Sequence, residues 1–317
     1  MQKSEEYRAL LDKLEVALEE VVPACVQADW MCELLLKPAQ EMALDLQAIL
    51  LPARDLIKRG ELPHNGSLII DDIEDKSDTR RGQPAIHKIY GEDVAINTGN
   101  FLYFLPTYIL EKVILPAPLK ERLIFSWLAV MRRLHIGQGL DIGWHNNPLY
   151  LPSIQEYSDM CRWKTGCLAG LAAQWGALLG GLTDEHAKEL GEIWQKIGIA
   201  FQILDDTSNL KQGNAGKKRG DDLLEGKKSY PLLVYALNNN PVPLLEDIKK
   251  LKEMRNSNEQ DLMIESIISR LNEKGCLQTA YEDGKKLLEE CKRELLATLP
   301  NTQALDLLLG LLDNFIS

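Results

Sequence analysis

An acidic cluster directly follows an apolar segment in the first third of the chain. Asp71, Asp75 and Asp78 have the spacing that places side chains on one face of a helix. Like charges at that spacing repel each other by roughly 0.2–0.5 kcal/mol per pair, so a bound cation would stabilise them. Carboxylate oxygens without nitrogen or sulfur ligands suit Mg²⁺, which often shares its ligands with substrate phosphates. Arg80 and Arg81, which follow at once, are the partners that a diphosphate would bind.

A second, weaker acidic segment occurs far along the chain in a similar setting. An apolar run at 201–204 leads into Asp205 and Asp206, and Asn209 follows one helical turn after Asp205. A solvated acidic helix face with a chance pair of arginines would explain one such cluster. Two clusters, each at the end of an apolar helical run, favour a shared site for metal ions and a diphosphate.

The bulk composition limits the class of protein and its partners. The chain has 317 residues, enough for one large domain, and 45% of them are hydrophobic, as in a globular protein. A formal net charge of −11 argues against a nucleic-acid partner, because phosphate backbones select basic surfaces. No apolar run reaches the roughly 18 residues that a membrane span needs. The cysteines lack zinc-site spacing and no signal peptide precedes the chain, so we expect a cytoplasmic location.

The hydrophobic period is helical in nearly every segment that has one. Apolar residues recur at helical spacing at 5–21, 185–204, 244–254, 260–271, 280–296 and 303–315. Alternating strand patterns are absent, and glycine and proline pairs mark the breaks between helices. A polar, glycine-rich stretch at 212–222 is expected to be a flexible loop beside the site. The pattern predicts a single all-α domain over residues 1–317.

Five segments of the sequence resemble those of the trans-isoprenyl diphosphate synthases, and most closely the eukaryotic-type geranylgeranyl diphosphate synthases. In chain order they read HNGSLIIDDIEDKSDTRRGQPAIHKIYG, IGQGLDIGW, KTGCLAGL, FQILDDTSNL and GDDLLEGKKSYPLL. The resemblance implies a helical bundle around a central cavity, of the class I terpenoid synthase type, and a homodimer. It also implies a Mg²⁺-dependent prenyltransferase that joins isopentenyl diphosphate to an allylic diphosphate (dimethylallyl, geranyl or farnesyl) and makes geranylgeranyl diphosphate.

The same resemblance assigns roles to individual residues. One set of residues would bind about three Mg²⁺ ions, and a second set of basic and polar residues would bind the substrates. Members of both sets would take part in catalysis. Asn209 stands where many members of the family have aspartate, and its amide oxygen would orient a metal-bound water. The metal set is Asp71, Asp72, Asp75, Asp205 and Asn209; the substrate set is His64, Arg80, Arg81, Lys164, Thr165, Gln202, Lys217 and Lys227; the catalytic set is Asp71, Asp75, Asp205, Lys164 and Gln202.

Product length is expected to depend on the size of the side chains along the cavity. Gly66 and Ser67 lie about one turn before Asp71 and are small, where farnesyl synthases of the family carry an aromatic residue. Tyr103 and Phe104, with His135, are the next large side chains and would form the floor of the cavity. The alternative is that the two aromatic residues are ordinary core residues.

Residues 20–62 depart from the family pattern. The family has a Gly-Lys-x-x-Arg element that grips isopentenyl diphosphate, but the corresponding stretch here has only Lys37 as a basic residue. Arg54, Lys58 and Arg59 are the other nearby cations. This departure keeps two further hypotheses open: a class I terpene cyclase or diphosphate lyase that uses the allylic site alone, and a non-catalytic subunit of a prenyl synthase.

Overall fold

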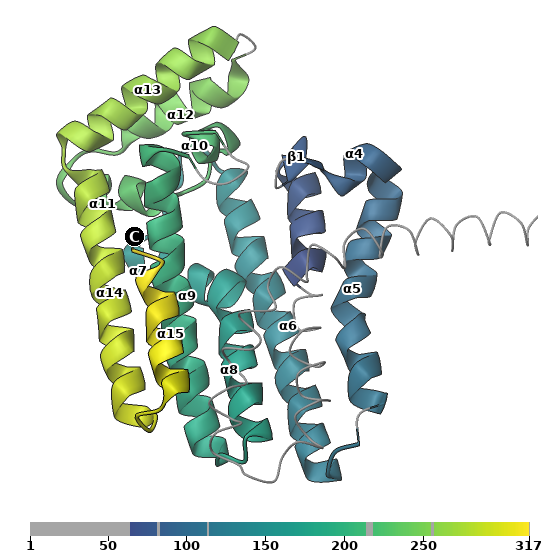
Figure 1. Ribbon diagram of the computed structural model, residues 1–317. Helices are drawn as coiled ribbons and strands as arrows, with labels where there is room; N and C mark the ends of the chain where they lie inside the picture. The colour runs from purple at the N-terminus through teal and green to yellow at the C-terminus, as the bar shows by residue number, and fades with distance from the viewer. Residues whose placement is uncertain (1–63, 81–82, 113, 214–217, 255–256, 317) are drawn as a thin grey trace, which may run out of the picture. The chain divides into compact units, whose positions relative to one another are not determined.

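The described part of the chain folds almost entirely into α-helices (Figure 1). The computed structural model describes residues 64–80, 83–112, 114–213, 218–254 and 257–316. Contacts within the chain gather into two compact units, and each is described by itself. Unit 1 comprises Met1–Ser126, Trp175–Ala187 and Thr302–Ala304, and unit 2 comprises Trp127–Gln174, Lys188–Asn301 and Leu305–Ser317. The prediction of one domain over 1–317 stays a prediction.

The described elements follow one another with short connections. A helix over 64–74 comes first. The other elements are β1 (Thr79–Arg80), β2 (Gln83–Pro84), α4 (Ile86–Tyr90), α5 (Glu92–Lys112), α6 (Ala117–His145), α7 (Ile154–Cys161), the π-helix η1 (Arg162–Gly166), α8 (Cys167–Leu179), α9 (Asp184–Lys211), α10 (Asp221–Glu225), α11 (Tyr230–Asn238), α12 (Val242–Glu253), α13 (Ser257–Glu273), α14 (Cys276–Thr298) and α15 (Gln303–Asp313).

In unit 1 the acidic helix 64–74 packs on α5. Ile69 of the first helix and Ala95 and Leu102 of α5 form a small buried cluster. The sequence predicted no strands, but a two-residue antiparallel pairing joins β1 to β2, with Arg80 opposite Gln83. This short hairpin leaves the fold class all-α, as predicted.

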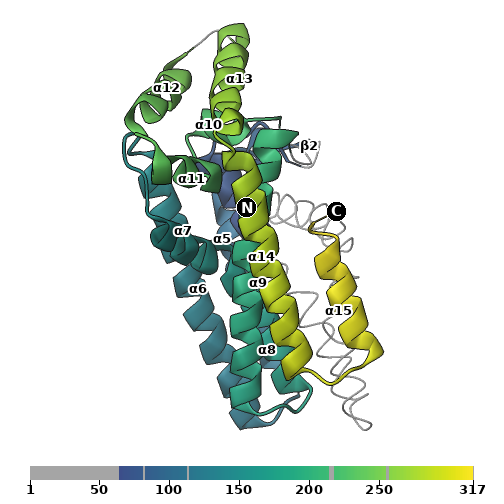
Figure 2. The ribbon, with the colours of Figure 1, turned by 90° about the vertical axis from the view of Figure 1, so that its left-hand side faces the viewer.

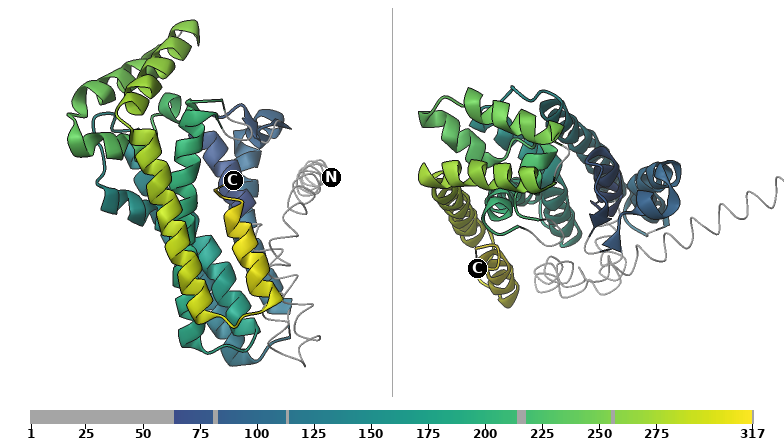
Figure 3. Two further views of the ribbon diagram at one scale, coloured as in Figure 1. Left: turned by 60° about the vertical axis from the view of Figure 1, so that its left-hand side comes forward. Right: turned by 90° about the horizontal axis from the view of Figure 1, so that it is seen from above.

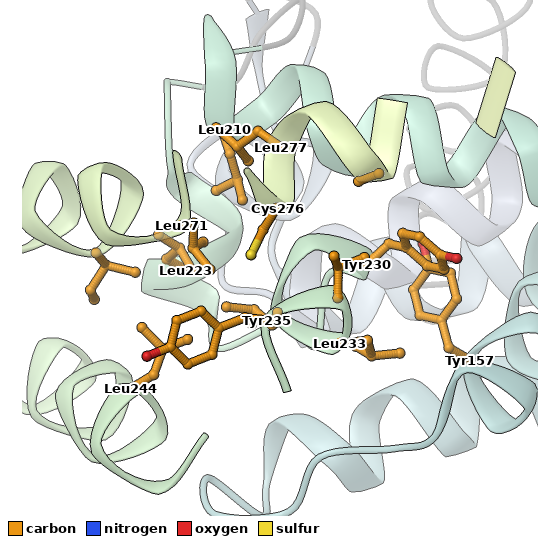
Figure 4. Packing of buried hydrophobic residues seen from close by; sticks show 14 of the residues in the cluster. Tyr157, Leu210, Leu223, Tyr230, Leu233, Tyr235, Leu244, Leu271, Cys276 and Leu277 are labelled. Carbon is orange, nitrogen blue, oxygen red and sulfur yellow. The ribbon is translucent and has the colours of Figure 1, made fainter. Parts of the chain in front are cut away.

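Unit 2 contains an extensive buried hydrophobic cluster. The side chains of this cluster come from α6, α7, α9 and α10 to α14, and Figure 4 shows how Tyr157, Tyr230 and their neighbours pack. Figures 2 and 3 show α14 running alongside α9, and Gly284 of α14 faces Ile203 and Leu204 of α9. A capping box starts α7: the side chains of Ser153 and Glu156 accept hydrogen bonds from each other's backbone N–H groups.

The helical period predicted the C-terminal half of the fold. The segments at 185–204, 244–254, 260–271, 280–296 and 303–315 correspond to α9, α12, α13, α14 and α15. The segment at 5–21 lies outside the described residues. The stretch at 212–222 is not wholly a loop, because α10 begins at Asp221 and buries Leu223 in the core. No helix within the described ranges is long and apolar enough to cross a bilayer.

Candidate active site

The first acidic segment lies at the carboxyl end of helix 64–74, in unit 1. The helix ends at residue 74, but the backbone N–H of Asp75 still donates to the carbonyl oxygen of Asp71 at 2.8 Å. Asp71 and Asp75 therefore stand one turn apart, both half-buried. Asp78 does not join them on that face as the spacing predicted, because the helix has ended; it is exposed and pairs with Lys88 at 2.9 Å.

Arg80 lies against the two adjacent aspartates of this segment. Its Nε donates to Oδ1 of Asp72 at 2.8 Å, its Nη2 also contacts that oxygen, and Nη2 lies 3.5 Å from Oδ2 of Asp71. Asp72 is only 2% exposed. Burial raises the pKa of the Asp72 carboxyl above its ordinary value, and the bond and charge of Arg80 only partly oppose this. Burial by itself lowers the pKa of Arg80, but the hydrogen bond to Asp72 and the charges of Asp72, Asp71 and Asp75 together outweigh burial and raise that pKa. Asp72, predicted as a metal ligand, thus anchors the arginine.

The carboxylate oxygens of this segment suit a divalent cation that takes most of its other ligands from water or a bound substrate. Asp71 and Asp75 offer only carboxylate oxygens, the ligands that Mg²⁺ prefers, and Mg²⁺ usually completes its shell with water and substrate phosphates. Within the described residues, no group of three or more His, Cys, Asp and Glu side chains is arranged to hold a metal on its own. A cation here would need further oxygens from a bound diphosphate.

In unit 2 a π-helix presents Lys164 and Thr165. Such π-helical turns are rare and are frequently found at functional sites, and this one follows α7 directly. Gly166 and Gly198 allow η1 to touch α9, because a Cβ on Gly198 would lie 2.4 Å from the Cα of Gly166. Thr165 is thereby brought to Gln202, one turn further along α9, and its hydroxyl donates to Oε1 of Gln202 at 3.1 Å.

Lys164 is held by a carboxylate to which the sequence analysis gave no role. Its Nζ lies 2.6 Å from Oδ2 of Asp141, whose other oxygen lies 2.8 Å from Nε2 of His145. Burial by itself raises the pKa of Asp141, but the charges of Lys164, His145 and Lys227 outweigh burial and hold that pKa well below its ordinary value. The signal was present in the sequence, since Asp141 belongs to the segment IGQGLDIGW.

The second acidic segment places its two aspartates in different environments. Asp205 is half-buried, whereas Asp206 is 6% exposed. Asp206 accepts hydrogen bonds from Tyr157 Oη (2.7 Å), the backbone N–H of Tyr230 (2.8 Å) and Nε2 of Gln202 (2.9 Å). Burial, reinforced by the charge of Asp222, raises the pKa of Asp206 to about 7. Asp206 therefore organises the core of unit 2, a role that the sequence analysis did not assign.

Asn209 and Lys227 are engaged by the segment that follows α9. The side-chain Oδ1 of Asn209 accepts a hydrogen bond from the backbone N–H of Asp222 at 3.4 Å. The backbone carbonyl oxygen of Asn209 accepts one from the backbone N–H of Gly220 at 3.2 Å. Asn209 is fully buried. Lys227 lies 2.6 Å from Oε2 of Glu225 and 3.8 Å from Oδ1 of Asp222. The predicted role of Asn209 in orienting metal-bound water stays a prediction, and the amide also has a structural role.

Of the residues predicted to set product length, His135 belongs to unit 2 and the others belong to unit 1. A Cβ on Gly66 would lie 2.8 Å from the carbonyl oxygen of Gly99 on α5, so close helix packing accounts for this glycine. Ser67 is half-buried and its Oγ donates to the carbonyl oxygen of His64. Tyr103 is buried, and burial, together with the charges of Glu74 and Asp71, raises its pKa.

The remaining predicted residues are exposed or undescribed. Phe104 is 68% exposed, because it follows Tyr103 directly and faces another side of α5. His135 is exposed on α6 and its Nδ1 lies 2.8 Å from the carbonyl oxygen of Met131. His64 is exposed at the start of its helix. Arg81, Lys217 and the basic residues at 37–59 lie outside the described residues.

An all-helical fold with two acidic segments, one at the end of helix 64–74 and one within α9, is typical of the helical isoprenoid synthases. Residues 38–269 match the sequence pattern described as polyprenyl synthetase, and the chain belongs to this family. A geranylgeranyl pyrophosphate synthase of Gibberella zeae is 38% identical over 190 residues, 59% of this chain and 49% of that protein. One of Epichloe festucae is 33% identical over 249 residues, 77% of this chain and 69% of that protein. The chain thus spans about half the length of the Gibberella relative.

Solved structures share the fold. A geranylgeranyl pyrophosphate synthase structure superposes with a TM-score of 0.82 at 20% identity, over 99% of this chain and 98% of that one. A polyprenyl synthase from Caulobacter crescentus CB15, described as complexed with calcium and isoprenyl diphosphate, has a TM-score of 0.73 at 19% identity, over 96% and 97% of the two chains. At these identities the likeness establishes the all-α isoprenoid synthase fold.

Proposed function

We propose that this protein is a Mg²⁺-dependent prenyltransferase that joins isopentenyl diphosphate to an allylic diphosphate and releases geranylgeranyl diphosphate. The observation that carries the proposal is the acidic end of helix 64–74, where Asp71 and Asp75 stand one turn apart with Arg80 beside them. Membership of the polyprenyl synthetase family and the names of the fungal relatives support it. The calcium described for the Caulobacter protein supports the use of divalent cations.

The reaction accounts for the residue types that the two units present. Breaking the allylic C–O bond leaves an electron pair and a growing negative charge on the diphosphate. When bound, Mg²⁺ would neutralise that charge, with Asp71, Asp75 and Asp205 as its protein ligands. Arg80, Lys164 and Lys227 would hold diphosphate oxygens and stabilise the leaving group more than the substrate.

Formation of the new C–C bond requires a site that excludes water and a group that accepts one proton. The allylic cation left by ionisation must be shielded from water, which would otherwise trap it. The double bond of isopentenyl diphosphate then supplies the electrons of the new C–C bond. The released diphosphate accepts the proton that is lost when the new double bond forms. Thr165 and Gln202 would present polar oxygens next to the cation.

Several features of the proposal rest on the family resemblance. These are the number of metal ions, the identity of the allylic substrate, a homodimer and a cytoplasmic location. The proposal also requires the two acidic segments to act on one diphosphate.

Product analysis tests the proposal against its two alternatives. The full chain is incubated with Mg²⁺ and farnesyl diphosphate, with and without isopentenyl diphosphate, and the dephosphorylated products are separated by chromatography. Geranylgeraniol that requires both substrates and disappears with a chelator supports the proposal. A hydrocarbon or rearranged alcohol formed from farnesyl diphosphate alone would identify a cyclase or lyase. A folded chain without turnover would point to a non-catalytic subunit.

A further inference from the structure

Four side chains of unit 2 form a continuous hydrogen-bonded path from the core to η1. Tyr157 donates to Oδ2 of Asp206 (2.7 Å), Nε2 of Gln202 donates to Oδ1 of Asp206 (2.9 Å), and Thr165 donates to Oε1 of Gln202 (3.1 Å). The backbone N–H of Tyr230 donates to Oδ2 of Asp206 at 2.8 Å. Asp206 and the two tyrosines are buried, whereas Thr165 and Gln202 are half-buried and accessible to a ligand.

The chemistry of these groups gives the path a direction. A side-chain amide has an acceptor end and a donor end, whereas a carboxylate only accepts hydrogen bonds. The carboxylate of Asp206 therefore selects the NH₂ end of Gln202. The carbonyl end of that amide is turned toward Thr165, whose hydroxyl donates to it.

We propose that Asp206 is a positioning residue that fixes the direction of the Gln202 amide, so that an oxygen rather than an NH₂ group faces Thr165. This inference rests on the proposed function, in which Thr165 and Gln202 lie beside the allylic cation. An amide oxygen pointing toward a developing positive charge stabilises it, and a reversed amide opposes it. Asp206 acts only through Gln202 and touches no substrate itself.

Replacement of Asp206 by asparagine reverses the path without breaking it. The backbone N–H of Tyr230 can only donate, so the oxygen of the new asparagine must face it. The asparagine NH₂ group is then left facing Gln202. Gln202 must turn its own amide over to accept, and its NH₂ group then donates to the hydroxyl of Thr165. Every hydrogen bond is retained while the dipole beside Thr165 is inverted.

The first test compares steady-state kinetics of full-length variants at pH 8.5 with Mg²⁺ and both substrates. Asp206→Asn is expected to lower kcat by about tenfold to a hundredfold, with KM for the allylic diphosphate within about threefold of the wild-type value. The matched control is Tyr157→Phe, which removes one bond to the same carboxylate but leaves the direction of Gln202 unchanged; its kcat is expected to fall less than about threefold. A merely structural role for Asp206 predicts comparable losses in both variants.

The second test restores the direction by a second substitution. In Asp206→Asn combined with Gln202→Glu, the asparagine donates to the new carboxylate, and the other carboxylate oxygen again accepts from Thr165. We expect kcat to rise at least about tenfold above that of Asp206→Asn. Retention of more than half of the wild-type kcat in Asp206→Asn, or a double variant no faster than Asp206→Asn, would overturn the proposal.

A stability measurement separates this inference from the proposed function. Gln202→Glu alone places two carboxylates side by side, so its urea midpoint should fall, and adding Asp206→Asn should raise that midpoint again. This comparison needs no turnover and stands even when the wild-type chain forms no prenyl product. If Asp206→Asn lowers the midpoint of Gln202→Glu further, residues 202 and 206 are not paired as inferred.

Discussion

The buried carboxylate of Asp141 is expected to contribute strongly to stability through its charge. It is 6% exposed and lies 2.6 Å from Nζ of Lys164 and 2.8 Å from Nε2 of His145. Removing one partner of a buried ion pair typically costs about 3–5 kcal/mol. Asparagine has nearly the same shape and keeps one acceptor oxygen, so we expect Asp141→Asn to lower the free energy of unfolding by about 2–3 kcal/mol.

The effect should depend on pH with a definite sign. Because the pKa of Asp141 is depressed in the folded protein, its contribution is fully present above the pKa of the unfolded chain, near 3.8. That contribution is lost as pH falls toward the folded pKa. The difference in stability between the wild type and Asp141→Asn should therefore be present at neutral pH and narrow below about pH 4.

Urea unfolding followed by circular dichroism, repeated across this pH range, measures the difference. The control is Glu192→Gln, which removes an exposed pair in which Lys188 lies 3.7 Å away. This surface pair should change the free energy of unfolding by no more than about 0.5 kcal/mol. Equal stability of the wild type and Asp141→Asn at neutral pH, or a difference that widens in acid, would refute the reasoning.

Three further outcomes are expected. Asp71→Ala should lower kcat by on the order of 10³-fold, because in the proposed function Asp71 is a metal ligand; a variant that keeps a tenth of the steady-state activity contradicts the metal assignment. Lys228 is buried, its Nζ donates to the carbonyl oxygen of Pro148, and burial lowers its pKa from 10.5 to about 8. The wild type should therefore gain stability relative to Lys228→Met as pH rises from 7 to 11, by on the order of 2–3 kcal/mol in denaturant titrations; a flat difference would show that the lysine is not desolvated. Gly66→Ala should lower the free energy of unfolding by about 1–3 kcal/mol, since the added methyl group meets the carbonyl oxygen of Gly99. Chromatography should show a product of unchanged length; a longer or shorter product would indicate that Gly66 lines the cavity.

The all-helical class followed from the sequence because helical periodicity is a local property. Segments such as 185–204 and 280–296 carry enough apolar residues at this spacing to define helices α9 and α14. The end of helix 64–74 was less predictable. The pattern at Asp71, Asp75 and Asp78 continued beyond the helix, whereas the chain turns at Lys76, whose φ is 56°. Local spacing does not report where tertiary contacts end a helix.

The sequence by itself determined which groups are candidates for the chemistry of this protein. Asp71, Asp75 and Asp205 were predicted as metal ligands, and the basic and amide residues as substrate contacts, from ordered segments that resemble those of a family. Residue type is a local fact, so a single chain suffices to predict a metal and diphosphate chemistry.

Only the tertiary structure decided what each neighbouring side chain does. Adjacent aspartates have opposite surroundings: Asp205 is half-buried, whereas Asp206 is bound by Tyr157 and Tyr230 from distant helices. Asp141 likewise acquires its partner from 23 residues away. Burial and hydrogen-bond partners arise from long-range packing, and they determine whether a carboxylate is a ligand, a counter-ion or an anchor. The sequence lists the carboxylates, and the packing assigns their roles.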